Sequence, residues 1–296
     1  MIRLVVLGSS AAMPSPKSVP SSFAIKSGST FLFDACEGVQ RQMMKYGISY
    51  SKLKCVFVSH LHADHFLGIF GLVQTMNMQG RKEELIIFGP EGTKETIGKA
   101  LGIKGLMPNF PVRIEESKRK KKLYSDKLIS VSCFPVKHKC KALGFVMEEE
   151  PIRKFKEELA RSKGISGRLF SEIEEKGFVE INGKRIELDD VTYLKPGKKI
   201  VYTGDTIACK EIVKNAKDAN LLIHDATFLD SEKDTAKQKW HATAKDAAET
   251  AKKANVKSLL LTHFSNRYEK LEPFLEEAKK IFSETAIAEE GKEIMI

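Results

Sequence analysis

The segment FVSHLHADHFLG, at 57–68, places His60, His62, Asp64 and His65 within six positions. Three of these four residues are histidines, and the chain of 296 residues has only seven histidines in all. Side chains of this kind are rarely buried without a hydrogen-bond partner or a metal ion. Imidazole and carboxylate are also ligands that Zn²⁺ binds, at three or four per ion. The cluster therefore indicates a metal site.

Further candidate ligands follow apolar runs that have the character of strands. His138 follows ISVSCFPVK, Asp205 follows KIVYTG, and His263 follows SLLLT. The run LLIHDATF carries His224 and Asp225. If the strands of each sheet end at a common edge, these side chains can converge there on a rigid core.

The spacing of the cluster assigns its members to two ions. His60 and His62 can share one ion on a tight loop, and Asp64 and His65 can address a second ion as the loop enters a helix. The ligands still needed are His138 for the first ion, His263 for the second, and Asp205 as a bridge. Two ions about 3.5–4 Å apart are the usual arrangement for hydrolysing phosphate esters. Ligands without thiolate favour Zn²⁺, with Mn²⁺ or Fe²⁺ as alternatives.

The hydrophobic pattern predicts an α/β chain in which strands alternate with helices. The strands are expected at 2–8, 22–27, 30–34, 54–58, 85–88, 128–136, 199–203, 220–224 and 257–262. The helices are expected at 37–46, 66–77, 92–101, 151–161, 243–254 and 268–282. Packed sheets with helices on their outer faces fit this order.

One segment, at 148–195, interrupts this pattern with a high density of charge and a weak hydrophobic period. It predicts a helix after Pro151 and a hairpin around INGK. On its sequence alone, a solvated surface insertion is the simpler interpretation, and an arm that grips a substrate is the alternative. The run KRKKK at 118–122 is expected to be a solvated loop.

Composition limits the partners and the cellular compartment that the sequence favours. The formal net charge is +10, which favours polyanionic partners such as nucleic acid. No apolar run approaches the roughly 18 residues of a membrane span, and the N-terminus lacks a basic leader, so we expect a cytoplasmic protein without a membrane anchor. The five cysteines include no CxxC pair, which argues against a disulfide framework. Cys140 lies near His138, but we expect it not to be a ligand.

With these motifs the sequence resembles the metallo-β-lactamase superfamily and, within it, the tRNase Z family of tRNA 3′-processing endoribonucleases. The resemblance runs almost end to end, through LFDACEGVQRQM, SHLHADHFLGI, VKH, YTGDT, HDATF, WHATA and LTHFSNRY. It implies a four-layer αβ/βα sandwich spanning 1–296, with a protruding, tRNA-gripping arm at about 150–190. It also implies a zinc-dependent hydrolysis of precursor tRNA after the discriminator nucleotide, by a homodimer carrying two Zn²⁺ per subunit.

The resemblance also implies roles for individual residues. It gives the seven ligands the same assignment as the spacing does, and it makes Asp64 the acceptor of the attacking water's proton. His241 in WHATA would donate a proton to the leaving 3′-oxygen, with Asp225 supporting it. The arm offers cations that could contact tRNA phosphates, namely Arg153, Lys154, Arg161, Lys163 and Arg168.

The sequence departs from the family pattern at three places. Ile207 and Ala208 follow GDT where many relatives carry Arg-Pro, Asp225 stands where relatives usually have Glu, and the arm shows GISGRL in place of a Gly-Pro-rich tip. The alternative enzyme is a small-molecule phosphodiesterase of the same fold. A non-catalytic RNA-binding module would keep the basic arm but would need no seven-ligand site.

Overall fold

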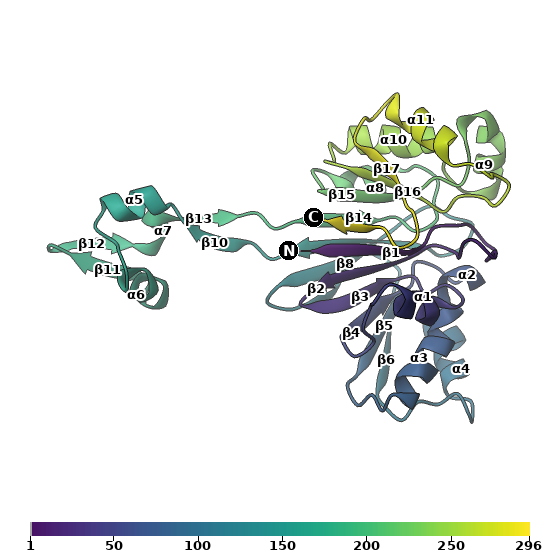
Figure 1. The fold of residues 1–296 in the computed structure, drawn as a ribbon, viewed down its shortest axis with the longest axis horizontal. Coiled ribbons are helices and arrows are strands. Elements are labelled where there is room, and N and C mark those ends of the chain that lie inside the picture. The colour runs from purple at the N-terminus through teal and green to yellow at the C-terminus, as the bar shows by residue number, and fades with distance from the viewer. Residues whose placement is uncertain (1) are drawn as a thin grey trace. The chain divides into compact units, whose positions relative to one another are not determined.

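Two seven-stranded sheets pack face to face in the computed structural model, which describes residues 2–296 (Figure 1). The first sheet has the order β18-β1-β2-β3-β4-β5-β6. Its strands are β1 (Arg3–Gly8), β2 (Ser22–Ser27), β3 (Ser29–Phe33), β4 (Leu53–Phe57), β5 (Leu85–Pro90), β6 (Val112–Ser117) and β18 (Glu293–Met295). The second sheet has the order β17-β16-β15-β14-β9-β8-β7. Its strands are β7 (Lys121–Ser125), β8 (Ile129–Pro135), β9 (Leu143–Glu149), β14 (Lys199–Tyr202), β15 (Leu221–Asp225), β16 (Leu259–Thr262) and β17 (Thr285–Ile287).

Helices cover the outer face of each sheet, so the layers run helix, sheet, sheet, helix (Figure 1). The helical segments on the side of the first sheet are α1 (Val39–Lys45), α2 (Ala63–Phe66), α3 (Gly68–Met78), a π-helical turn (Lys94–Gly98) and α4 (Lys99–Leu101). Those on the side of the second sheet are α8 (Lys210–Ala216), a 3₁₀ turn (Asp230–Glu232), α9 (Lys233–Lys239), α10 (Ala244–Lys253) and α11 (Glu272–Lys279). This is the four-layer sandwich that the resemblance implied.

The strands are apolar throughout because both of their faces are buried. In β1, Leu4 and Val6 belong to the core between the sheets, whereas Val5 and Leu7 pack under the helices. In β16, Leu260 faces the other sheet and its two neighbours face the helices. Successive side chains of a strand point to opposite faces, so a continuous apolar run fills two layers of core at once.

Several strands of each sheet run in parallel and end at one edge. Strand β3 is parallel to β4 and β4 to β5, while β14 is parallel to β15 and β15 to β16. Loops that leave the carboxyl ends of such strands can bring polar side chains together on a buried, rigid base.

Residues 149–197 form a second compact unit, which is described by itself. It contains β10 (Ile152–Phe155), α5 (Glu157–Ser162), α6 (Leu169–Lys176), β11 (Phe178–Ile181), β12 (Lys184–Glu187), α7 (Leu188–Val191) and β13 (Thr192–Lys195). Strands β10 and β13 form an antiparallel ribbon, and a small apolar core holds the rest together. The predicted hairpin is present as β11 and β12, and its turn residues Asn182 and Gly183 both have positive φ, as a two-residue hairpin turn requires.

Two predictions about local structure were wrong. Residues 152–155 are a strand and not the start of a helix, because their backbone pairs with 192–195, far along the chain. Part of the KRKKK run is also a strand, since Lys121 and Lys122 belong to β7 and pair with β8.

Candidate metal centre

All seven predicted ligands lie at the carboxyl ends of strands, in the larger unit. His60, His62, Asp64 and His65 come from the loop after β4 and the short helix α2. His138 follows β8, Asp205 follows β14, and His263 directly follows β16. The ligands therefore come from both sheets.

The first group of donor atoms contains three imidazoles and one thiol. Nε2 of His60 lies 2.9 Å from Nδ1 of His62, and Nε2 of His138 lies 3.3 Å from the same atom. The sulfur of Cys140 belongs to the same group, in which all ligand atoms lie within 4.8 Å of one another. Sequence reasoning predicted the imidazoles but expected Cys140 not to be a ligand, whereas the structure places its sulfur within this group.

The second group combines imidazoles with the carboxylate of Asp64. Its Oδ2 lies 3.3 Å from Nε2 of His65 and 3.7 Å from Nε2 of His263. The carboxylate of Asp205 lies between the two groups, because its Oδ2 is 3.6, 3.3 and 3.2 Å from Nε2 of His60, His65 and His263. The carboxylate of Asp205 thus faces histidines of both groups.

Hydrogen bonds behind the rings decide which nitrogen faces the centre. Nδ1 of His138 donates to the carbonyl oxygen of Trp240 at 2.9 Å, so the lone pair is on Nε2. The hydroxyl of Thr227 donates to Asp225 and therefore accepts from Nδ1 of His263, at 2.9 Å. Such contacts fix the ring orientation of metal-binding histidines in general.

The backbone of His263 contributes to this placement. Its φ is 65°, in the left-handed region that a residue with a side chain seldom adopts. Strain of this kind persists where surrounding contacts hold it, often at functional sites. Here the conformation turns the ring at the end of β16 toward Asp64 and Asp205.

The donor set fits a divalent cation. Nε2 of His65 and Nε2 of His263 are buried and have no hydrogen-bond partner among residues 2–296. Burial lowers the pKa of His60, His62 and His138, which favours the neutral imidazole that a metal ligand must have.

The negative charges around His65, in the second group, also favour a bound cation. Burial alone would lower the pKa of His65, but the charges of Asp205 and Asp34 outweigh it and raise the pKa. The same carboxylates favour a cation beside the Nε2 atom. These His and Asp clusters therefore fit a divalent metal ion.

Asp34 is a central polar residue that sequence reasoning missed. Its fully buried carboxylate accepts hydrogen bonds from Nδ1 of His65 at 2.7 Å, from the hydroxyl of Tyr202 at 2.6 Å, and from both the backbone NH and the hydroxyl of Ser59. Ser59 in turn accepts from Nδ1 of His60 at 3.0 Å. Asp34 is the last residue of the strand predicted at 30–34 and directly follows the observed strand β3, and a polar residue at the end of an apolar run is the signal that could have identified it.

His241 lies beside the ligands and is oriented by Asp225. Nδ1 of His241 donates to Oδ2 of Asp225 at 2.8 Å, so the shorter Asp still reaches the ring. The carboxylate is itself fixed by the backbone NH groups of Thr206 and Thr227 and by the Thr227 hydroxyl. Burial alone would lower the pKa of His241, but the charge and hydrogen bond of Asp225 raise it to about 9.

The other polar residue of that run, His224, does not join the site. It is fully buried, and its Nδ1 contacts its neighbour's backbone carbonyl at 2.8 Å. It belongs to none of the ligand groups formed by residues 2–296.

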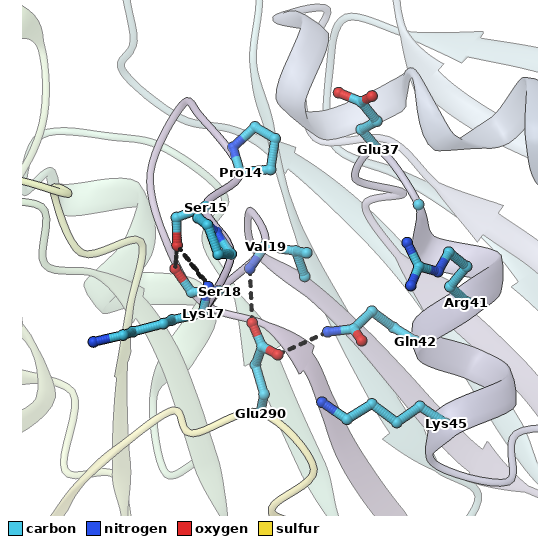
Figure 2. A pocket seen from close by; sticks show the side chains of 12 residues that line it. Pro14, Ser15, Lys17, Ser18, Val19, Glu37, Arg41, Gln42, Lys45 and Glu290 are labelled. Atoms are coloured by element: carbon cyan, nitrogen blue, oxygen red, sulfur yellow. Dashed lines mark hydrogen bonds between the residues drawn. The ribbon is translucent and has the colours of Figure 1, made fainter.

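A cavity of about 630 Å³ lies apart from the ligands, between the loop 14–19 and α1 (Figure 2). None of the seven predicted ligands lines it. Glu290 joins its two walls, since its carboxylate accepts from the backbone NH of Val19 at 2.7 Å and from the side chain of Gln42 at 2.8 Å. Before this loop, the backbone NH of Ala12 donates to Asp64 at 3.1 Å. The loop is therefore tied to the centre at one end and to Glu290 at the other.

Comparisons with known proteins agree with this fold. A family model described as anti-Pycsar protein Apyc1 matches residues 2–105, and a model described as beta-lactamase superfamily domain matches residues 185–264. The chain is similar to human tRNase Z, short form, whose crystal structure aligns with a TM-score of 0.73 at 26% identity over 99% of both chains. The metallo-beta-lactamase fold protein YhfI from Bacillus subtilis also has a TM-score of 0.73, at 20% identity, which supports the fold.

Full-length sequence similarity is more specific. Ribonuclease Z from Ignicoccus hospitalis is 38% identical over 99% of this chain and 98% of its own length. Ribonuclease Z from Methanosarcina acetivorans is 38% identical over 100% of this chain and 98% of its own. With the fold and the donor clusters in place, this similarity shows that the chain belongs to the ribonuclease Z family of the metallo-β-lactamase superfamily.

Proposed function

We propose that this protein is a metal-dependent endoribonuclease that removes the 3′ trailer of precursor tRNA. It hydrolyses the phosphodiester after the discriminator nucleotide and leaves a 3′-hydroxyl on the tRNA and a 5′-phosphate on the trailer. The observation that carries the proposal is the convergence of His and Asp donors from both sheets in a member of the ribonuclease Z family.

We further propose two Zn²⁺ ions per subunit. The first would be held by His60, His62 and His138, the second by Asp64, His65 and His263, and Asp205 would bridge them. When bound, two such ions supply Lewis acidity to the scissile phosphate and acidify the attacking water. The protein holds the donors ready for this role through the hydrogen bonds behind each ring.

Asp64 is the candidate acceptor for the proton of the attacking water. Burial alone would raise the pKa of this carboxyl, but its contacts with His263 and His65 lower it, so the group is ionised. The backbone NH of Ala12 donates to Oδ2 at 3.1 Å and fixes the carboxylate. In the proposed reaction this carboxylate would accept the proton of the attacking water as the new bond to phosphorus forms.

His241 is the candidate donor to the leaving 3′-oxygen. Nδ1 is engaged by Asp225, which leaves Nε2 as the nitrogen that can deliver a proton. Its ring stacks on that of His263, with centroids 5.1 Å apart, and therefore lies next to the predicted ligands. Asp225 favours the charged imidazolium, which is the form that a general acid needs.

The compact unit at 149–197 is our candidate for gripping tRNA. Of its five proposed phosphate contacts, Arg153 pairs with Asp189, and Lys163 lies 3.7 Å from Asp190. The other three are Lys154, Arg161 and Arg168, which are exposed and form no ion pair with any residue of 2–296. Unpaired cations are the better candidates, because a phosphate need not compete with a carboxylate for them.

The family resemblance also supports a homodimer, which light scattering of the purified protein would test. None of the helices in residues 2–296 combines the length and apolar character that crossing a bilayer requires. All five cysteines are free thiols, which supports a reducing compartment such as the cytoplasm.

The deciding experiment is incubation with a tRNA that carries a 3′ trailer, with the cut mapped to the nucleotide. We expect a single cut after the discriminator and close to two equivalents of metal by elemental analysis of the active preparation. A protein that hydrolyses bis(p-nitrophenyl) phosphate but leaves the trailer intact would instead be a small-molecule phosphodiesterase. Metal content of one equivalent or none would contradict the two-ion centre.

A further inference from the structure

Cys140 lies in the loop that carries His138, between β8 and β9. We propose that its sulfur is a further protein ligand of the ion held by His60, His62 and His138, in addition to the bridging carboxylate of Asp205. The proposal rests on the proposed metal centre but is independent of the RNA substrate.

The loop places His138 and Cys140 on the same side. Exposure alternates along it, with Lys137, Lys139 and Lys141 exposed, His138 buried and Cys140 half-buried. Residues 138–140 form a bend, and the burial of His138 and the partial burial of Cys140 between exposed lysines place both side chains toward the interior. The backbone bond from Val136 NH to the Ala142 carbonyl, at 3.2 Å, closes the loop and fixes this register.

A second loop presents a matching pair of donors. His60 and His62 are also two residues apart, and their ligand atoms lie with those of His138 and Cys140 in one group, all within 4.8 Å of one another. A His-x-His segment thus faces a His-x-Cys segment across a space that four donor atoms surround.

The three nitrogens of this group point to a cation independently of the sulfur. Nδ1 of His138 donates to a carbonyl, and Nδ1 of His60 donates to Ser59, so the Nε2 atom of each ring carries a lone pair. These atoms crowd around Nδ1 of His62 at 3.3 and 2.9 Å. Lone pairs packed so closely are stabilised by a shared positive ion.

No other cysteine has this environment among residues 2–296. Cys36, Cys55 and Cys133 are fully buried, and none belongs to a ligand group. Cys209, which is half-buried, packs against the apolar core beneath the helices of the second sheet. Cys209 therefore provides a matched control, because it is a partly exposed thiol outside the centre.

Binding of the metal by Cys140 exchanges one bond of the sulfur for another. The S–H bond of Cys140 breaks, a sulfur–metal bond forms, and the proton passes to solvent. A thiolate makes this position softer than the second one and favours Zn²⁺ over Mn²⁺ there. The two ions should accordingly differ in how readily a chelator removes them.

The test uses the full-length protein loaded with Co²⁺. We expect a sulfur-to-cobalt charge-transfer band in the near ultraviolet for the wild type and for Cys209→Ser, and its loss in Cys140→Ser. In parallel, Zn²⁺ should protect Cys140 but not Cys209 from alkylation, as read by peptide mass spectrometry. A band that survives in Cys140→Ser, no band in a fully loaded wild type, or equal alkylation of Cys140 with and without Zn²⁺ would overturn the proposal.

Cleavage of precursor tRNA by the same preparations separates this proposal from the proposed function. Loaded protein that cuts after the discriminator but shows no sulfur-to-cobalt band refutes only the thiolate ligand. Protein that shows the band but leaves the trailer intact supports the ligand and refutes the nuclease assignment. Far-ultraviolet circular dichroism of Cys140→Ser confirms that any loss of the band occurs in a folded protein.

Discussion

The carboxylate of Asp34 accepts a hydrogen bond from Nδ1 of His65 at 2.7 Å, and both side chains are fully buried. This contact fixes the tautomer of His65 and turns its Nε2 toward Asp64 and Asp205. A residue that is not itself a predicted ligand therefore decides how a ligand is presented.

Asp34→Asn should weaken metal binding while the fold is retained, because the amide keeps the shape but loses the charge that holds His65. We expect metal affinity to fall by about 10–100-fold, measured by competition with a chromophoric chelator. Tyr202→Phe is the control, since it removes one hydrogen bond to Asp34 but leaves the carboxylate in place. Equal affinities for Asp34→Asn and Tyr202→Phe would show that the charge of Asp34 is irrelevant.

His65→Ala should abolish cleavage of precursor tRNA and leave tRNA binding mostly intact. The imidazole contacts both Asp64 and Asp205, so its loss opens the second donor group. RNA affinity should persist because the cations of 149–197 are untouched. Single-turnover cleavage and filter binding measure the two effects, and turnover at the wild-type rate would reject a role for this histidine.

His241→Ala should slow single-turnover cleavage by about 10²–10⁴-fold with little change in substrate affinity. Asp225→Asn should cause a smaller loss through the same ring. If Asp225 acts by orienting His241, the double variant should be no slower than His241→Ala alone. Additive losses would show that Asp225 acts by another route, and thermal unfolding of each variant reports on its fold.

Removal of residues 153–194, which make up most of the 149–197 unit, should impair cleavage of precursor tRNA far more than hydrolysis of bis(p-nitrophenyl) phosphate. Ile152 and Lys195 are partners in the antiparallel ribbon, so a short turn can join them in place of 153–194. Equal losses on both substrates would mean that the unit supports the fold of the active centre.

Single substitutions test whether individual cations of the 149–197 unit contact tRNA. Arg161→Ala and Arg168→Ala should each weaken tRNA binding and reduce the slope of log affinity against log salt by about 1. Lys176→Ala is the control, because Lys176 is already paired with Glu172 at 2.7 Å. A control that loses as much affinity as the two arginine variants would point to a general effect of net charge.

The predicted elements that the structure contains are those whose pattern is local. Strands such as β1 and β16 are apolar on both faces, and α10 has a capping box at Thr243 and Asp246. Strands β10 and β13 were not predicted because they are largely exposed and exist only through pairing with each other. Exposed ribbons of this kind leave no hydrophobic period in the sequence.

In the candidate site, too, some residues could be predicted from a local sequence pattern and others depend on tertiary contacts. The predicted ligands are polar residues that follow apolar runs or cluster together, so their chemistry is visible in the sequence. Ser59, Thr227 and the carbonyl of Trp240 act only through contacts made after folding. Hydroxyls and backbone carbonyls occur everywhere in a chain, and only tertiary structure selects the few that orient a ligand.

The predicted ligands are divided between the two sheets, with His60–His65 on one and His138, Asp205 and His263 on the other. A cation bound between them would therefore cross-link the two sheets of the sandwich. A nascent chain that has not yet reached His138 lacks part of the predicted donor set of both ions. The protein would then become active only when both sheets have folded. An incompletely folded copy would have no complete metal site and could not cut RNA indiscriminately.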